Sequence, residues 1–166
     1  MKIFLVGMPG SGKTTLGKEL SLALALPFID LDRDIEEQIQ MTIPDIFRTK
    51  GEPFFREMES ERLHYWSSGT DGFVMATGGG APCFFDAMNT MKSIGLVLFL
   101  DVPLEELLLR LEKDTHRPLL EDKVGLKEKL NRLMRDRISI YQQAHASIHG
   151  AGIQLKDLLQ ALEFKN

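Results

Sequence analysis

Apolar residues occur along this chain in short runs that alternate with stretches of helical periodicity. The runs at residues 2–6, 73–76 and 94–100 are apolar on both faces, which is typical of buried strands. Shorter runs at residues 27–31 and 147–149 predict two further strands. A first helix is predicted from the end of segment 7–14 to about residue 25, and another begins near Pro103. Further helices are predicted at residues 33–40, 44–48, 54–66, 126–144 and 155–164. This alternation predicts an α/β fold in which helices cover both faces of a parallel sheet.

The polar and glycine-rich segments of the chain follow the predicted strands. Four of them have suggestive chemistry, at residues 7–14, 31–34 and 78–80 and in the region after Asp101. Ligands of open parallel sheets bind beyond the carboxyl ends of the strands. We therefore expect these segments to meet in a single site.

Residues 7–14 read GMPGSGKT and fit the phosphate-loop pattern G-x-x-x-x-G-K-[ST]. The segment lies between a predicted strand and a predicted helix, which is the context that the pattern requires. Its glycines let backbone N–H groups surround phosphate oxygens, and Lys13 and Thr14 have the chemistry to reach the β/γ-phosphates and to ligate Mg²⁺. The alternative is an ordinary strand-to-helix turn that contains glycines. We interpret the segment as a nucleotide-binding loop.

Two carboxylates, Asp32 and Asp34, stand two positions apart where the second predicted strand enters a helix. Either could simply cap that helix. In the functional interpretation one carboxylate holds Mg²⁺, directly or through water, and the other accepts a proton from a substrate hydroxyl. The nearby phosphate loop favours the functional interpretation.

Arg56 lies early in a predicted helix, three residues before Glu59. This spacing fits a surface ion pair. It equally fits an arginine that binds a substrate carboxylate and is oriented by Glu59. The residues alone leave both interpretations open.

Two other segments have the composition of ligand-binding loops. Three successive glycines, at residues 78–80, are expensive to order and suit a backbone that must approach a small molecule closely. The polar stretch 112–123 contains Arg117, which predicts a solvated loop or a mobile lid whose arginine closes over a transferring phosphoryl group.

The composition narrows the class of protein. A chain of 166 residues fits one domain, so we expect a single domain over residues 1–166. The net charge of −4 argues against binding of nucleic acid through bulk charge. Cys83 is the sole cysteine, which excludes an intrachain disulfide. Because no apolar run approaches a membrane span, we expect no membrane partner and a cytoplasmic location.

Taken together, the ordered motifs resemble those of shikimate kinases. They stand at residues 7–14, 31–34, 45–47, 51–56, 77–80 and 117–120, with Arg137 four residues before Tyr141. The resemblance runs from Ile3 to about Ala146. It implies a P-loop kinase fold with a five-stranded parallel sheet in the order 2-3-1-4-5. It also implies phosphorylation of the 3-hydroxyl of shikimate by ATP with one Mg²⁺, on the route to aromatic amino acids, by a monomer.

The resemblance further implies a role for individual residues on the nucleotide side. The nucleotide contacts are Gly10, Ser11, Gly12, Lys13, Thr14, Thr15, Arg110 and Arg117, with Arg110 packed on adenine. Thr14 and, through water, Asp32 hold the metal. Arg117 belongs to a lid at about residues 112–124 and contacts both substrates.

On the acid side, the resemblance implies a substrate-binding segment at about residues 32–62. The shikimate contacts are Asp34, Arg56, Gly78, Gly79, Gly80 and Arg137, with apolar walls from Ile43, Phe47, Phe55 and Pro118. Asp34 is the candidate base and forms the catalytic set with Lys13 and Arg117. Arg56 and Arg137 bind the substrate carboxylate.

The chain departs from the usual pattern of the family in three places. The phosphate loop reads MPGS between its outer glycines, and residues 137–141 read RISIY where the family usually has proline and leucine. After Ile148 the turn is only residues 149–152, where the family usually has a longer turn, often with a residue that faces adenine. This third departure leaves nucleotide selectivity open.

Two competing functions fit parts of the pattern. A P-loop kinase for another small metabolite, such as gluconate or a nucleotide, would share the phosphate loop. A nucleotide-binding regulator without turnover would share it too, but would not need the carboxylates and the paired arginines. ATP turnover with a panel of substrates discriminates among the three.

Overall fold

The structure is a computed structural model that describes residues 1–113 and 123–163. The strands are β1 (Lys2–Val6), β2 (Phe28–Asp30), β3 (Phe73–Ala76), β4 (Leu96–Asp101) and β5 (Ala146–His149). The helices are α1 (Lys13–Leu24), α2 (Leu31–Ile39), α3 (Ile43–Thr49), α4 (Gly51–Ser68), the 3₁₀ turn η1 (Ala81–Cys83), α5 (Ala87–Ile94), α6 (Leu104–Lys113), α7 (Lys123–Tyr141) and α8 (Leu155–Glu163). All strand pairs are parallel, in the order β2-β3-β1-β4-β5. This confirms the predicted architecture.

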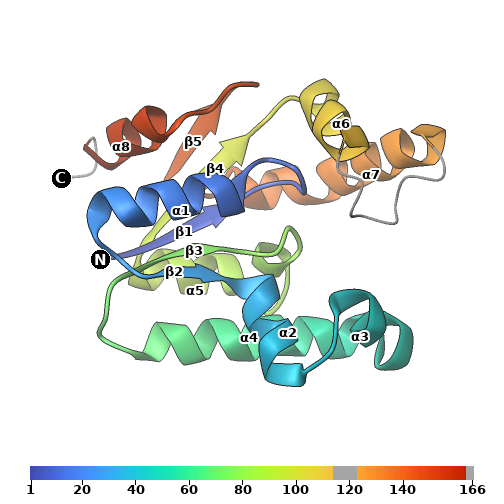
Figure 1. Cartoon of the computed structure of the whole chain (residues 1–166), viewed down its shortest axis with the longest axis horizontal. Helices are drawn as coiled ribbons and strands as arrows, with labels where there is room; N and C mark the ends of the chain where they lie inside the picture. The colour runs from blue at the N-terminus through green and yellow to red at the C-terminus, as the bar shows by residue number, and fades with distance from the viewer. Residues whose placement is uncertain (114–122, 164–166) are drawn as a thin grey trace.

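The sheet separates two apolar layers because successive strand residues point to opposite faces. Ile3 and Leu5 of β1 belong to a cluster with α1 and α8, whereas Phe4 and Val6 belong to a second cluster with α4, α5 and α7. Figure 1 shows α1 and α8 on one side of the sheet and α4 and α5 on the other. Both faces of the central strands are therefore buried, as their continuous apolar sequence requires.

Several element boundaries differ from the sequence prediction. Helix α2 begins at Leu31, two residues before the predicted start, with Asp30 as its N-cap. Elements η1 and α5 were not predicted, although Met88 and Met91 of α5 pack in the core. Helix α5 has eight residues, too short for periodicity to outweigh its flanking loop sequence. Most of the predicted lid lies outside the described residues.

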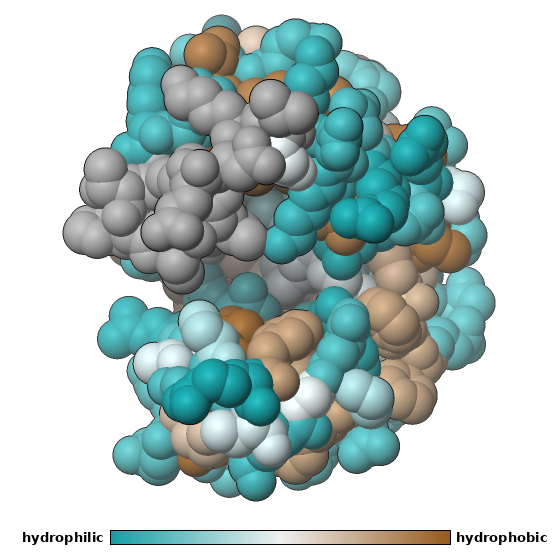
Figure 2. Space-filling view, turned by 90° about the vertical axis from the view of Figure 1, so that its right-hand side faces the viewer, coloured by the Kyte–Doolittle hydropathy of each residue, from teal (hydrophilic) through white to brown (hydrophobic). Residues whose placement is uncertain are grey.

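The carboxyl ends of the strands converge as expected. Strand β1 runs into the phosphate loop, β2 ends at Asp30, and β3 leads through Thr77 to the glycines at 78–80. Thr77 locks β3 to β1 because its backbone N and its hydroxyl both donate to Leu5 O, at 3.2 and 3.0 Å. Figure 2 shows a hollow on the side of the molecule toward which these strands point.

Within the described part of the chain, we find no helix with both the length and the apolar character needed to cross a membrane.

Candidate active site

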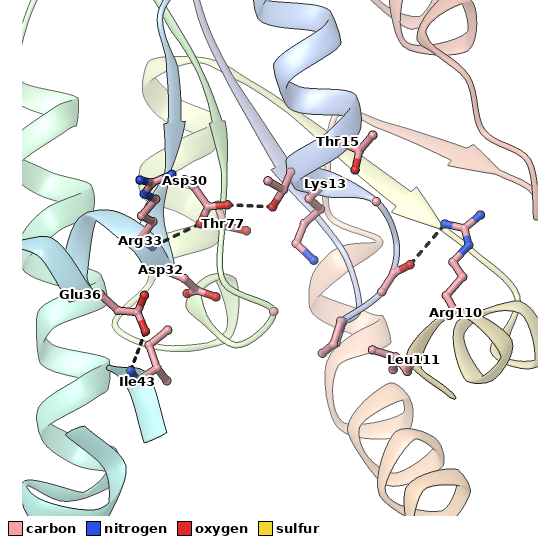
Figure 3. A pocket seen from close by; sticks show the side chains of 15 residues that line it. Lys13, Thr15, Asp30, Asp32, Arg33, Glu36, Ile43, Thr77, Arg110 and Leu111 are labelled. Atoms are coloured by element: carbon pink, nitrogen blue, oxygen red, sulfur yellow. Dashed lines mark hydrogen bonds between the residues drawn. The ribbon is translucent and has the colours of Figure 1, made fainter. Parts of the chain in front are cut away.

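A cavity of about 660 Å³ opens beyond the strand ends. The phosphate loop, the start of α2 and the end of α6 surround it (Figure 3). Its lining includes Gly10, Gly12, Lys13, Thr14, Thr15, Asp30, Asp32, Ile43, Thr77, Gly79 and Arg110. The side chains of Lys13 and Asp32 extend into this space from opposite walls. The cavity thus joins residues of the predicted nucleotide and acid sites.

The phosphate loop is closed around its own lysine. The Lys13 ammonium donates to the carbonyls of Gly7 and Met8, both at 2.9 Å, and to Ser11 Oγ at 3.4 Å. Gly10 and Gly12 have φ angles of 81° and 94°, in the left-handed region that side chains rarely adopt. This conformation turns the loop into the first turn of α1. The N-terminus of that helix faces the cavity, where it favours an anion.

Asp30 is a site residue that the sequence analysis missed. Its Oδ2 accepts the Thr14 hydroxyl at 2.8 Å, and its Oδ1 accepts the backbone N–H of Arg33 at 3.3 Å (Figure 3). The signal was present, because Asp30 and Asp32 have the same two-residue spacing as Asp32 and Asp34. The predicted strand extended too far, so the pairing was assigned to the later two residues.

Asp34 does not face the main cavity, which corrects the position predicted for it. It forms an ion pair with Arg62 of α4, at 2.7 Å to Nε and 3.1 Å to Nη2. Because α2 already includes Asp32 and Asp34, two positions along it rotate a side chain by about 200°. Asp32 therefore lines the cavity, whereas Asp34 lines a neighbouring cavity of about 370 Å³.

The three glycines bring the remaining predicted residues together. A Cβ atom at Gly78 would lie 2.5 Å from Asp32 Oδ1 and 2.6 Å from Glu59 Oε1. One at Gly79 would lie 3.2 Å from Arg137 Nη1, and one at Gly80 would lie 2.6 Å from Arg56 Cζ. None of the three glycines has a left-handed φ angle. They are therefore required for space, so that charged groups from α2, α4 and α7 reach one backbone segment.

Arg56 is buried and held by carboxylates of its own helix. Its Nε and Nη2 donate to Glu52 Oε1 at 3.1 and 2.7 Å, and its Nη1 donates to Glu59 Oε2 at 2.7 Å. Burial alone would lower the pKa of Arg56, but Glu59 and then Glu52 raise it. The guanidinium therefore remains charged although Arg56 is only 8% exposed. Recognition of an acid requires this charge.

Glu59 is a buried acid near this site whose pKa is strongly raised. Burial raises its pKa to about 7, against the opposing effect of Arg56, and the neighbouring charge of Asp32 raises it further. Its Oε1 is buried, with no hydrogen-bond partner among the described residues. The sequence analysis gave Glu59 the task of orienting Arg56, and its contact with Nη1 has the geometry for that task.

Helix α7 contributes Arg137 and Tyr141. The Tyr141 hydroxyl donates to the Gly79 carbonyl. The centres of the Tyr141 and Phe99 rings lie 5.2 Å apart. Burial raises the pKa of Tyr141, so its hydroxyl stays protonated and keeps donating. Arg137 lies one helical turn earlier against the same glycine. The tyrosine thereby fixes the loop that Arg137 approaches.

Arg110 links three segments at the opposite edge of the cavity. It pairs with Glu106 at 2.7 Å and donates to Gly10 O of the phosphate loop at 3.3 Å. It also donates to Ala151 O, in the short segment that follows β5. The side chain predicted to pack on adenine thus ties the phosphate loop to the segment where this chain is shorter than expected.

The predicted apolar walls are distributed around α3 and α4. Ile43 lines the cavity. The rings of Phe47 and Phe55 lie 4.9 Å apart, with Phe55 buried and Phe47 partly exposed. Arg117 and Pro118 lie outside the described residues, as does most of the predicted lid.

Comparison with known proteins identifies the family. Residues 9–163 match the family model described as shikimate kinase. A shikimate kinase of Bacteroides fragilis is 43% identical over 148 residues, which cover 87% of this chain and 82% of the relative. The crystal structure of shikimate kinase from Bacteroides thetaiotaomicron superposes with a TM-score of 0.89 at 35% identity, covering 99% of this chain and 96% of that one.

A second solved structure, shikimate kinase from Acinetobacter baumannii in complex with shikimate, superposes with a TM-score of 0.85 at 36% identity, covering 99% and 90% of the two chains. A gluconokinase from Sinorhizobium meliloti also superposes, with a TM-score of 0.63 over 99% of this chain and 92% of that one, but at 14% identity it shares the fold alone. Matches to the family model and to relatives of this identity span most of the chain, which therefore belongs to the shikimate kinase family.

Proposed function

We propose that this chain transfers the γ-phosphoryl group of ATP to the 3-hydroxyl of shikimate, giving shikimate 3-phosphate and ADP. The observation that carries the proposal is the meeting of a phosphate loop, two carboxylates and two buried or half-buried arginines around Gly78, Gly79 and Gly80. Family membership supports the same substrate pair. The negative net charge and the small cavity suit a small acid rather than a nucleic acid.

On the nucleotide side, the phosphate loop would bind ATP through its backbone N–H groups and Lys13. The ammonium already points at the loop carbonyls and would exchange them for phosphate oxygens. Arg110 would border the base, and Arg117 would contribute charge from the lid. This arrangement supplies positive charge where the transferring group becomes most negative.

Thr14 and Asp30 fit Mg²⁺. They offer a hydroxyl and a carboxylate whose oxygens lie 2.8 Å apart at the cavity wall. Mg²⁺ prefers oxygen ligands and is usually held by one or two side chains together with phosphates. When bound, the ion would neutralise phosphate charge. This assignment moves the metal contact from Asp32 to Asp30.

The metal assignment predicts different requirements for added Mg²⁺. We expect Asp30→Asn to need several-fold more Mg²⁺ for half-maximal turnover, because a neutral amide binds the ion more weakly. Excess Mg²⁺ should restore part of its activity. Asp34→Asn is the matched control, because Asp34 pairs with Arg62 and is not proposed to bind the ion. It should follow the wild-type Mg²⁺ titration. Identical titrations for all three proteins would contradict the assignment.

Asp32 replaces Asp34 as the residue that contacts the acceptor hydroxyl. It lines the main cavity between the phosphate loop and Gly78. We propose that its carboxylate orients the hydroxyl and accepts its proton as the phosphoryl group transfers. Phosphoryl transfer depends mainly on positioning and charge, so the orientation of this hydroxyl is the larger contribution.

Arg56 and Arg137 would bind the carboxylate of shikimate. They approach neighbouring glycines from α4 and α7, and both guanidinium groups suit a planar carboxylate. Gly79 and Gly80 would lie against the ring of the acid, with Ile43 and Phe55 as apolar walls.

A coupled assay of ADP release tests the proposed function directly. We expect turnover with shikimate that exceeds turnover with gluconate and with nucleoside monophosphates by orders of magnitude. Equal or greater turnover with gluconate would overturn the substrate assignment. ATP binding without turnover on any acid would favour the regulator.

A further inference from the structure

The loop that carries the three glycines also carries Phe84, which contacts the buried guanidinium of Arg56. The Arg56 Cζ atom lies 4.6 Å from the centre of the Phe84 ring. The same loop touches this guanidinium a second time at Gly80, where the absence of a Cβ lets the arginine approach. One loop therefore holds Arg56 at two points, four residues apart.

Core burial does not account for the position of Phe84. Its side chain is 39% exposed, and Phe85 beside it is 57% exposed. Arg56, in contrast, is 8% exposed. The ring of Phe84 instead lies over a buried cation, which its face attracts, and it is nearer to Arg56 Cζ than the ring of Phe55 at 5.4 Å.

The backbone around Phe84 is strained and well anchored. Phe85 and Asp86 both have left-handed conformations, with φ angles of 50° and 57°. This conformation is unfavourable for a bulky side chain such as that of Phe85. The turn is held by a bond from Ala87 N to Phe84 O at 3.0 Å and by one from Asn89 Nδ2 to Asp86 Oδ1 at 2.7 Å. Strain of this kind persists where surrounding contacts determine the conformation, and it is concentrated at binding sites.

The contacts around Arg56 divide between the edge and the face of its guanidinium. Glu52 and Glu59 accept three of its N–H bonds, and a guanidinium has five N–H donors. Phe84 uses none of these donors, because a ring attracts the cation through its face. The ring therefore restrains the guanidinium and excludes water while leaving N–H groups available for a ligand carboxylate.

From this geometry we infer that Phe84 is a positioning residue for recognition of the acid substrate, acting through Arg56. The inference rests on the proposed assignment of Arg56 to the substrate carboxylate. It adds a residue that no phosphate-loop or arginine motif of the sequence indicates. Its effect belongs to binding of the acid and not to phosphoryl transfer or binding of ATP.

Three variants at neighbouring positions test the inference. Phe84→Leu keeps an apolar side chain but removes the ring, and Phe84→Tyr restores a ring face. Phe85→Leu is the matched control, because Phe85 is more exposed and has no ring contact with an arginine among the described residues. Steady-state assays give kcat and the KM values for shikimate and ATP, and thermal unfolding checks that each variant folds.

We expect Phe84→Leu to raise the KM for shikimate by about five-fold, the equivalent of about 1 kcal/mol. Its kcat and its KM for ATP should remain near the wild-type values, and Phe84→Tyr and Phe85→Leu should behave like the wild type. An unchanged KM for shikimate in Phe84→Leu overturns the inference. So does an equal rise in Phe84→Tyr, or a rise in both KM values.

Arg56→Ala, assayed in parallel, separates this inference from the proposed function. If Arg56→Ala raises the KM for shikimate and Phe84→Leu does not, only the role of Phe84 is wrong. If Arg56→Ala leaves that KM unchanged, the assignment of Arg56 to the substrate carboxylate fails, and with it the basis of the inference.

Discussion

The phosphate loop and the acid-binding half of the cavity are built in contrasting ways. The loop is one contiguous segment, residues 7–14, whose shape follows from its own glycines and its lysine. The acid-binding half takes Asp32, Arg56 and Arg137 from three helices and gathers them at residues 78–80. A contiguous motif is visible in the sequence, whereas an assembled site depends on where each helix begins and which face it turns inward.

The largest effect should come from the loop. We expect Lys13→Ala to lower turnover by more than about 100-fold, because a preorganised charge on the phosphates is lost. ADP release with saturating substrates measures this change. Lys18→Ala is the matched control, since Lys18 lies on the same helix, is exposed, and faces the Phe28 ring. Near wild-type turnover for Lys13→Ala would contradict the kinase interpretation of the loop.

The second prediction tests Asp32 and Asp34, the two carboxylates whose tasks the structure reassigns. Asp32→Asn should lower kcat by about 100-fold, because an amide cannot accept the hydroxyl proton. Asp34→Asn should keep near wild-type kcat and instead lower the free energy of unfolding by about 1–3 kcal/mol, through its weakened bond to Arg62. Turnover and urea denaturation of both variants measure these changes. If Asp34→Asn lost turnover while Asp32→Asn kept it, the assignment of the acceptor hydroxyl to Asp32 would be wrong.

Asp32 and Asp34 also show how much of the fold and the site could be predicted from the sequence. The layers and the phosphate loop were predictable, because continuous apolar strands and a contiguous motif carry their own signal. The strand order was implied only by the resemblance to the family. The predicted strand ran to Leu31, one residue beyond the end of β2. The prediction therefore considered Asp32 and Asp34, whereas the structure places Asp30 and Asp32 at the main cavity, because a helix turns a side chain by about 100° per residue. Boundaries are set by capping, here by Asp30, which competes with strand pairing at this position.

Other parts of the site had no local signal. The contact of Phe84 with Arg56 joins residues that are adjacent only after α4 packs beside the loop that follows β3. Helix α5 was missed because its position is stabilised by packing of Met88 and Met91 and not by periodicity. The roles of individual residues remain predictions, which the variants described here test.

The third prediction tests residues 78–80, where the acid-binding side chains are gathered. In Gly80→Ala, the added Cβ would meet the Arg56 guanidinium at 2.6 Å from Cζ, so the arginine must move. We expect the KM for shikimate to rise by about ten-fold, consistent with about 1–3 kcal/mol for overpacking, while the KM for ATP stays near the wild-type value.

The control for this prediction is Gly69→Ala. The nearest atom that a Cβ at Gly69 would meet is Trp66 O at 3.9 Å, so the substitution should be tolerated. A rise of equal size in both KM values for Gly80→Ala would indicate that the loop supports the whole cavity. In that case the contrast between a local and an assembled half would be wrong.

The last prediction concerns stability and Glu59, the buried acid beside Arg56. Burial raises the pKa of Glu59 from 4.5 to about 7. The folded protein therefore holds this proton more tightly than the unfolded chain, so stability falls as pH rises from about 4.5 to about 7 and is then constant. The change amounts to about 3 kcal/mol at most for a shift of this size.

Urea denaturation between pH 4.5 and pH 8 measures this contribution, with Glu59→Gln as the non-titrating reference. The difference in unfolding free energy between wild type and variant should shift against the wild type across that interval and level off above it. The phosphate loop contains no acid, so its residues contribute no comparable slope. A difference that does not vary with pH would show that Arg56 compensates burial fully, so that the pKa of Glu59 keeps its ordinary value and the assembled half is as insensitive to pH as the loop.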